Sequence, residues 1–446
     1  MKRRDHAIGA ALCIAYVALL LWTAPDLAMS RDESFYVHAA KGYATWMAEL
    51  VTEPSSALTQ GSIDRAWRYN WEHPAWMKLT FAWSWLAQKH LGLFPRESLA
   101  FRFPGMATAG LLLWLIYAWG ASVMSRRGAL FAAIAFALMP RVFYHSHLDC
   151  FDVPIAFFVT LTAYAYWRAL ADSRWVPIVG LAFGLALATK HNSWILPGIF
   201  LIHFAWLRSD QARAASPERA SIRWLVSMLV LGPAVFLATW PWLWHDTWSR
   251  IAGYVGFHLR HVHYTYQFLG VSYFGPPLPV SVPFVMTLFT VSLPILALAI
   301  VGVVYRRNEL RPWWRVEPGD ALSRRADVLW LGCLLAPLLA IALPTSPIFG
   351  GTKHWLPAYP FLALFAGCGL LAVTARAELG AWSGRRWPSW AFAAFCLVPS
   401  AVQTAHSHPF GLSHYMPIAG GVPGAADLGM NRQFWGFTTG SLVPWL

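Results

Sequence analysis

Long apolar runs, separated by short charged segments, dominate the chain. The runs that are long enough to span a bilayer predict about eleven membrane helices. The predicted spans are residues 7–24, 103–121, 129–147, 153–168, 175–190, 191–207, 224–243, 283–305, 328–345, 355–374 and 388–403. The pattern therefore predicts an all-α polytopic membrane protein.

The polar positions gather in a few connections, of which the first is by far the longest. Residues 25–102 separate the first two predicted spans, and the stretches 33–51 and 76–90 mix apolar and polar residues as interfacial helices do. We expect a membrane domain over residues 1–403, with the first outer loop at 25–102. A short outer tail follows at 404–446.

The composition agrees with a membrane protein, and the distribution of basic residues predicts how the chain is oriented in the membrane. The chain of 446 residues is 57% hydrophobic and only 12% charged, with a net charge of +13. The basic residues are scattered over short loops without a nucleic-acid motif, so a nucleic-acid partner is not expected. An N-terminus inside the cell assigns the following basic residues to the inner face: Lys2, Arg3, Arg4, Arg126, Arg127, Arg168, Arg174, Arg208, Arg213, Arg219, Arg223, Arg306, Arg307, Arg311, Arg315, Arg324, Arg325, Arg376, Arg385 and Arg386.

The first span also has the composition of a signal peptide. No small-residue cleavage site follows it, so we expect an uncleaved signal anchor. Four of the five cysteines lie in apolar segments and only Cys150 lies outside them, so no disulfide framework is predicted.

The second outer loop invites a metal hypothesis. Its two imidazoles and two carboxylates lie within eight residues and are chemically adequate for a divalent ion. The candidate ligands are His145, His147, Asp149 and Asp152. Spacing within a loop is a poor guide to coordination, and Asp152 before Val-Pro is equally typical of a helix cap. A divalent metal is thus possible, and no cofactor is required.

Several outer segments together resemble a known family. The order of "RDESFY", "HPAW", "FRFPG", "HSHLDCFDVPIAFF", "GLALATKHNSWILP" and "KHWLPAYPFLAL" is similar to that of polyprenyl-phosphate-dependent glycosyltransferases. This family includes protein O-mannosyltransferases and the aminoarabinose transferases of lipid A. The resemblance implies the type C glycosyltransferase (GT-C) fold, and it extends over most of the chain.

The resemblance implies a catalytic base in the cluster that follows the first span. The first acidic residue of this motif has that role in similar enzymes, which points to Asp32 as the base and Glu33 as a supporting residue. The competing interpretation is a solvated helix cap in which Asp32 is the N-cap residue. In similar transferases an acidic residue of the second outer loop often has a structural or acceptor-site role.

Similar enzymes also use cations around the lipid phosphate. The matching positions are His73, Arg260 or His261, and Lys353 or His354. Lys190 is a further candidate, because a lysine at an intramembrane helix junction is costly unless it lines a cavity or finds a partner. The alternative interpretation is that the Lys190 side chain snorkels to the membrane interface, and the same alternative applies to Arg260 and Lys353. His73 departs from the aminoarabinose branch, which carries lysine there, and this weakens the likeness to that branch.

We therefore predict an inverting glycosyltransferase that moves a sugar from a polyprenyl-phosphate donor to a lipid, glycan or protein acceptor. The reaction is expected on the periplasmic or extracellular face, in a bacterial inner membrane. The alternative is a transporter or flippase of a lipid-linked sugar, although neither an internal repeat nor midplane charges support it. A polymerase or ligase that uses a lipid pyrophosphate is a second enzymatic rival. A nucleotide-sugar donor is disfavoured, because the sequence has no glycine-rich phosphate loop.

Overall fold

The computed structural model describes residues 3–213, 221–306, 321–378, 388–432 and 434–438. Many of the predicted inner-face basic residues lie in segments 214–220, 307–320 and 379–387, outside the described residues, as do Lys2 and the end of the predicted tail, 439–446.

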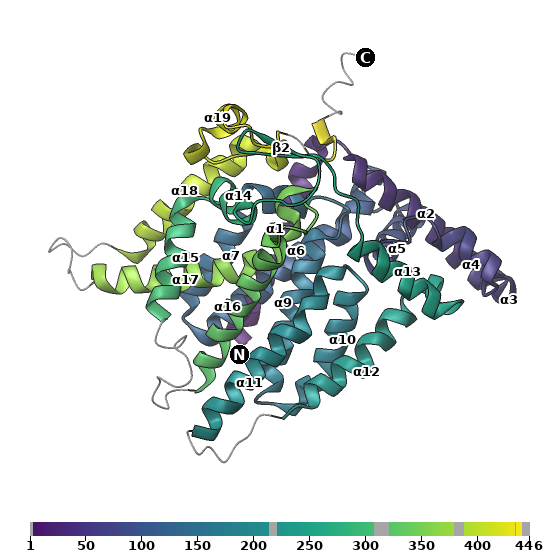
Figure 1. Cartoon of the computed structure of the whole chain (residues 1–446), viewed down its shortest axis with the longest axis horizontal. Coiled ribbons are helices and arrows are strands. Elements are labelled where there is room, and N and C mark those ends of the chain that lie inside the picture. The colour runs from purple at the N-terminus through teal and green to yellow at the C-terminus, as the bar shows by residue number, and fades with distance from the viewer. Residues whose placement is uncertain (1–2, 214–220, 307–320, 379–387, 433, 439–446) are drawn as a thin grey trace.

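Helices build almost the whole structure (Figure 1). The helices of the first two-fifths of the chain are α1 (Arg3–Thr23), α2 (Arg31–Thr52), α3 (Pro54–Ala57), α4 (Gln60–Trp67), α5 (Trp76–Leu91), α6 (Glu97–Val123), α7 (Arg126–Ala137), α8 (Pro140–Ser146) and α9 (Asp152–Ala169). The later helices are α10 (Val176–Leu187), α11 (Leu196–Arg213), α12 (Arg223–Ala238), α13 (Thr247–Leu259), α14 (Val282–Thr290), α15 (Leu293–Tyr305), α16 (Ala321–Ala342), α17 (Tyr359–Glu378), α18 (Ser389–Ser407) and α19 (Gly421–Asp427). This architecture agrees with the predicted all-α membrane class.

Prolines break several of the predicted spans. By length and composition, three helical segments of the described chain can cross a membrane, namely 3–26, 97–123 and 356–375. The pair α7 and α8 bends by 73° before Pro140 and would be a fourth span. The predicted span 283–305 likewise divides into α14 and α15. The backbone is extended at Val291, and Pro294 in the first turn of α15 lacks the N–H that a continuous helix would need. The shorter apolar helices are 173–187, 223–238, 293–305 and 326–342.

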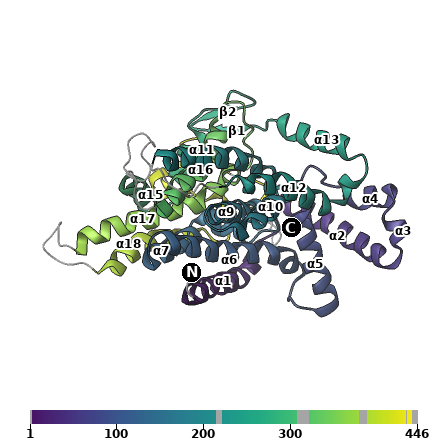
Figure 2. The same ribbon diagram turned by 90° about the horizontal axis from the view of Figure 1, so that it is seen from below.

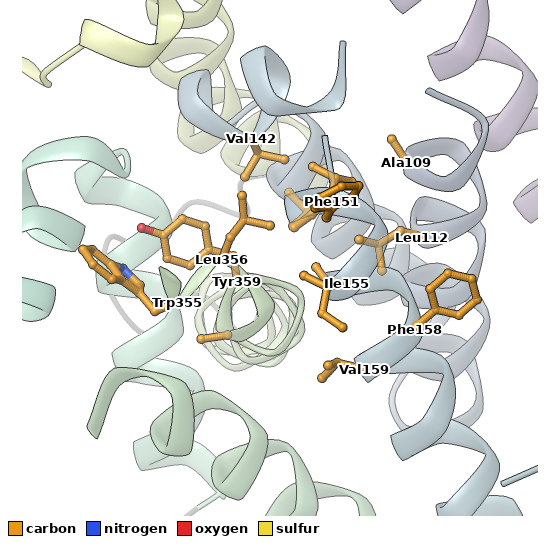
Figure 3. Packing of buried hydrophobic residues seen from close by; sticks show 14 of the residues in the cluster. Ala109, Leu112, Val142, Phe151, Ile155, Phe158, Val159, Trp355, Leu356 and Tyr359 are labelled. Carbon is orange, nitrogen blue, oxygen red and sulfur yellow. The ribbon is translucent and has the colours of Figure 1, made fainter. Parts of the chain in front are cut away.

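Small residues allow the apolar helices to approach closely. A Cβ atom on Gly302 of α15 would collide with the backbone of Phe365 in α17, and one on Gly369 of α17 would collide with Leu298. Helix association in a membrane depends on this kind of close packing, because lipid provides little hydrophobic driving force between helices. In Figure 3, Phe151 and Ile155 pack in the same buried cluster as Leu356 and Tyr359.

The first outer loop forms a separate arm at one end of the molecule, where α2, α3, α4 and α5 project beside α13 (Figure 2). The predicted interfacial stretches 33–51 and 76–90 are α2 and α5. Arg250 of α13 donates to both carboxylate oxygens of Asp64 in α4, at 2.7 and 3.1 Å, and so joins α13 to this arm.

The part of the tail that the structure describes is folded against the domain. Arg141 donates to the carbonyl of His414 at 3.3 Å, and its guanidinium lies 5.0 Å from the ring centre of Tyr415. A small hairpin, β1 (Tyr266–Phe268) and β2 (Val271–Tyr273), pairs antiparallel, with Tyr266 opposite Tyr273. The backbone N–H of Gly270, in the turn of this hairpin, donates to the carbonyl of Gly429 and so ties the hairpin to the tail. The division into domain 1–403 and tail 404–446 stays a prediction.

Candidate active site

A cavity of about 600 Å³ lies where the first outer loop, α13 and the tail meet. Its described lining is unusually rich in ionisable side chains for a membrane protein. The ionisable lining residues, tyrosines aside, are Arg31, Asp32, Glu72, His73, Asp152, Lys190, His191, His258, His261, Lys353 and His354. Most of the predicted site residues are therefore brought together, although they come from distant segments of the chain.

Asp32 reaches the cavity from the first turn of α2. Ser30 is the N-cap residue of this helix, and its backbone N–H donates to Glu33 Oε2 at 2.7 Å as half of a capping box. The alternative in which Asp32 is the N-cap is therefore wrong. The Asp32 side chain is 13% exposed, and Lys353 Nζ lies 3.7 Å from its Oδ2. Because Glu33 takes over the capping, the Asp32 carboxylate faces the cavity.

Glu33 lies behind the cavity rather than in it. The side chain is fully buried, and it accepts from Arg102 Nε at 2.7 Å and Nη2 at 2.9 Å. Burial alone would raise the pKa of Glu33, but the charge and hydrogen bonds of Arg102 outweigh it, so the pKa lies below its ordinary value. Glu33 therefore anchors α2 to α6 and supports Asp32 only through this position.

Lys190 closes a second ion pair on the cavity wall. It follows α10, and its Nζ donates to Asp152 Oδ1 at 2.7 Å, at the start of α9. Lys190 therefore has a buried partner and does not snorkel. His145 Nδ1 lies 3.3 Å from the other oxygen of Asp152.

Lys353 and His354 approach from η7 (Gly351–His354), a single 3₁₀ turn before the core helix α17. Burial lowers the pKa of Lys353, and the nearby charges of Asp32 and Asp152 oppose this effect. Lys353 is thus a cation placed beside the candidate base.

His73 and His261 also line the cavity, whereas Arg260 does not. Arg260 ends α13 with an exposed side chain and is absent from the cavity lining. The prediction that Arg260 contacts the donor is therefore not supported. The reason is that α13 directs His258 and His261 to the cavity, and Arg260 lies between them on another face of the chain.

The predicted metal ligands do not converge. His147 is hydrogen-bonded to the carbonyl of Phe143 and to the Thr23 hydroxyl, both at 2.8 Å. Asp149 lies beside Glu33, and Asp152 pairs with Lys190. Within the described residues, no group of three or more His, Cys, Asp or Glu side chains is placed to hold a metal ion. The four residues thus do not form a metal centre in this structure.

The tail contributes residues that the sequence interpretation did not select. Asn431, Phe434 and Trp435 line the cavity, and the Trp435 carbonyl accepts from the Arg31 N–H at 3.1 Å. Trp435 has φ of 63°, a left-handed conformation that is rare for a large side chain. His191 and His258 were also missed as site residues. Both lie within motifs that drew attention to the neighbouring Lys190 and Arg260 instead.

Comparison with known proteins agrees with this fold. Residues 73–242 match the family of dolichyl-phosphate-mannose-protein mannosyltransferases. No curated protein sequence matches the chain.

Solved structures give the wider likeness. ArnT from Cupriavidus metallidurans, solved with undecaprenyl phosphate, is similar with a TM-score of 0.55 and 17% identity, over 89% of this chain and 70% of that one. The oligosaccharyltransferase of Archaeoglobus fulgidus is similar in its apo form with a TM-score of 0.54 and 14% identity, over 90% of this chain. This chain spans only 55% of that protein. The archaeal oligosaccharyltransferase AglB from Archaeoglobus fulgidus, in complex with an inhibitory peptide and a dolichol-phosphate, is similar with a TM-score of 0.53 and 13% identity, over 96% of this chain and 56% of that one.

These comparisons confirm the predicted resemblance and the GT-C fold of an integral membrane protein. The matched family is one of glycosyltransferases, in agreement with the predicted enzyme class.

Proposed function

We propose that this GT-C protein is a membrane glycosyltransferase that uses a polyprenyl-phosphate sugar as its donor. The observation that supports this most directly is the placement of Asp32 and Lys353 side by side, 3.7 Å apart, on the wall of one cavity. A carboxylate base and a cation are the two groups that displacement of a sugar from a phosphate requires. The relatives of this fold with undecaprenyl phosphate or dolichol-phosphate bound lend the donor class further support.

In the proposed reaction, Asp32 accepts the proton of an acceptor hydroxyl. The acceptor oxygen forms a bond to the anomeric carbon, and the bond from that carbon to the phosphate oxygen breaks. The electron pair leaves with the phosphate, so the lipid product gains negative charge near Lys353. A single displacement of this kind inverts the anomeric carbon. The acceptor is a lipid, a glycan or a protein.

We further propose a bacterial inner membrane location, with the N-terminus in the cytoplasm and the cavity on the periplasmic side. Short basic segments such as Arg126-Arg127 would then face the cytoplasm, as the distribution of positive charge favours. Side-chain cations, rather than a divalent ion, would neutralise the phosphate. Turnover that persists in EDTA supports this assignment, and turnover restored only by a divalent metal contradicts it.

The test is sugar release from a panel of polyprenyl-phosphate sugars by the purified protein, with membrane extract as the acceptor source. We expect one donor to be consumed by the native chain. Consumption should fall about 10²- to 10⁴-fold in Asp32→Asn, the range of one general base. Asp172→Asn is the matched control, because Asp172 caps a short turn away from the cavity. Donor binding without consumption would instead favour the transporter, and consumption of only pyrophosphate-linked donors would favour the polymerase or ligase.

A further inference from the structure

Three histidines from three separate elements form one wall of the cavity, which we call the histidine wall: His73, His191 and His258. His73 precedes α5, His191 begins η3 (His191–Ile195), and His258 lies in the last turn of α13. The rings of His191 and His258 are 4.0 Å apart between centres, and that of His73 is 6.3 Å from His258. Because protonated rings this close repel each other, few of them can be charged at the same time unless an anion binds beside them.

The ring nitrogens of this wall are only partly satisfied within the described part of the chain. His258 Nε2 lies 2.9 Å from the carbonyl of Glu72. A carbonyl can only accept, so Nε2 carries the proton and Nδ1 is the basic nitrogen of the neutral ring. The Nδ1 atoms of His73 and His191 are buried and have no hydrogen-bond partner among the described residues. The backbone beside His73 is held firmly, since buried Lys78 donates to its carbonyl at 2.8 Å.

The remaining charges of the cavity balance. Its described lining carries three permanent cations, Arg31, Lys190 and Lys353, against three carboxylates, Asp32, Glu72 and Asp152. With neutral histidines the cavity therefore has no net positive charge to offer a phosphate. Burial, followed by the nearby positive charges, holds the pKa of His73 well below its ordinary value, and burial lowers that of His258 to about 4. The empty wall is thus neutral at physiological pH.

We propose that the histidine wall is a phosphate subsite that takes up a proton from solvent when a lipid phosphate binds. This inference rests on the proposed function and specifies how its donor and product are held. The bound phosphate supplies the negative charge that the wall lacks, and a protonated ring donates an N–H to a phosphate oxygen. Cleavage turns the donor phosphodiester into a monoester with more negative charge, so the proton matters most for the product.

The sign of the pH dependence separates this arrangement from binding by lysines alone. A lipid phosphate monoester has its own second pKa near about 6, so acidification removes charge and weakens its binding to permanent cations. Proton uptake by the wall has the opposite effect, because the pKa of a ring rises when the phosphate binds. Affinity then increases as pH falls from the bound-state pKa towards the free-state pKa, by up to about tenfold per pH unit for one proton.

Other titratable groups surround the wall and must be considered in the same experiment. Those on the neighbouring elements are Arg31, Asp32, Glu72, Lys78, Asp152, Lys190, His261, Lys353 and His354. These groups are present in both the native chain and a variant that lacks two of the imidazoles, so a difference between the two proteins reports on the wall. This holds also for Lys78, whose pKa burial lowers to about 7.

The test is calorimetric binding of undecaprenyl phosphate to the full-length protein in detergent, between pH 7.5 and 5.5. Buffers of different ionisation enthalpy report protons taken up on binding. We expect net uptake, and an affinity that rises by at least fivefold across the range. The double variant His191→Asn, His258→Asn should abolish both the uptake and the rise in affinity. His245→Asn changes a half-buried histidine outside the cavity and should retain them. Undecaprenol, which lacks the phosphate, should give no uptake.

Three results would overturn the inference: affinity that stays constant or falls on acidification, uptake that survives in the double variant, or no binding at any pH. Inorganic phosphate in place of the lipid distinguishes the two sources of the ligand, since uptake with the lipid alone assigns the subsite to a lipid headgroup. Failure of the proposed function is separate. Proton-linked binding in a protein that turns over no donor would support the phosphate subsite and contradict the proposed glycosyltransferase activity. Turnover without proton uptake would contradict only the proposed subsite.

Discussion

The ammonium of Lys353 lies 4.2 Å from the centre of the Trp435 indole ring, so a residue of the tail covers the cation that faces Asp32. The indole also meets the ring of His145 edge-on, with centres 5.2 Å apart. The aromatic face stabilises the ammonium on one side and leaves its other side to Asp32 and the cavity.

Replacement of Lys353 by methionine should lower turnover by about 10²-fold, because one stabilising donor at a developing negative charge is worth that much. The loss should be in kcat more than in KM if the charge develops during bond cleavage. Steady-state kinetics with whichever donor the sugar-release assay selects measures both constants. Arg260→Met removes an exposed cation outside the cavity and should change neither constant by more than threefold. An equal loss of turnover in Lys353→Met and Arg260→Met would contradict the placement of Lys353 in the active site.

Trp435→Phe should retain most of the activity, while Trp435→Ala should reduce it by about 30-fold or less, the value of a desolvated cation–π contact. Phenylalanine keeps an aromatic face for Lys353 and the same backbone hydrogen bond to Arg31. The measurement is kcat/KM for both variants, with thermal unfolding as a check on folding. Equal activity in the two variants would mean that the ring does not act on Lys353.

Arg102→Met and Glu33→Gln should each destabilise the fold by about 3–5 kcal/mol, because each leaves a buried partner of the ion pair unsatisfied. A double variant, Glu33→Met with Arg102→Met, should be more stable than either single one. Thermal unfolding in detergent compares the three. The pKa of Glu33 is lowered in the fold, so its contribution is fully present above the unfolded value of about 4.3 and is lost only as pH falls through the folded value.

Asp149 should behave in the opposite way. It is fully buried beside Glu33, and burial, with the negative charge of Glu33, raises the pKa of this carboxyl well above its ordinary value. Its favourable contribution is therefore present below the unfolded pKa of about 3.9 and is lost as pH rises to the folded value. Asp149→Asn should raise Tm at pH 8 and have a smaller effect at pH 5. A Tm difference that is independent of pH would show that Asp149 is not the titrating group.

The sequence predicted the parts of this protein that depend on local pattern. Apolar length and the mixture of apolar and polar residues identified α9 and the interfacial helices α2 and α5 to within two residues, and α6 to within six. The motif after the first span identified Asp32 as a site candidate, and the structure brings it to the cavity. The alternatives Arg260 and His261 could not be separated from the sequence, because neighbouring residues face different directions and sequence alone does not fix the rotation of the chain at the end of α13; the structure places His261 at the cavity.

The rest depended on contacts between distant segments. The sequence gives no sign that Glu33 would pair with Arg102 instead of facing the substrate, since that contact joins two helices across the first loop. The histidine wall has the same origin, because His73, His191 and His258 become neighbours only when three elements pack. Trp435 lies in the predicted outer tail, 404–446, and its position in the sequence does not indicate which elements it contacts.

The hydrogen bond from Arg31 to the Trp435 carbonyl joins two segments that are far apart in the chain. The wall of the cavity beside Asp32 therefore depends on the docking of the tail as well as on the apolar helices. A substitution that loosens the tail would uncover Lys353 and open this side of the cavity, although it changes no residue of the predicted spans.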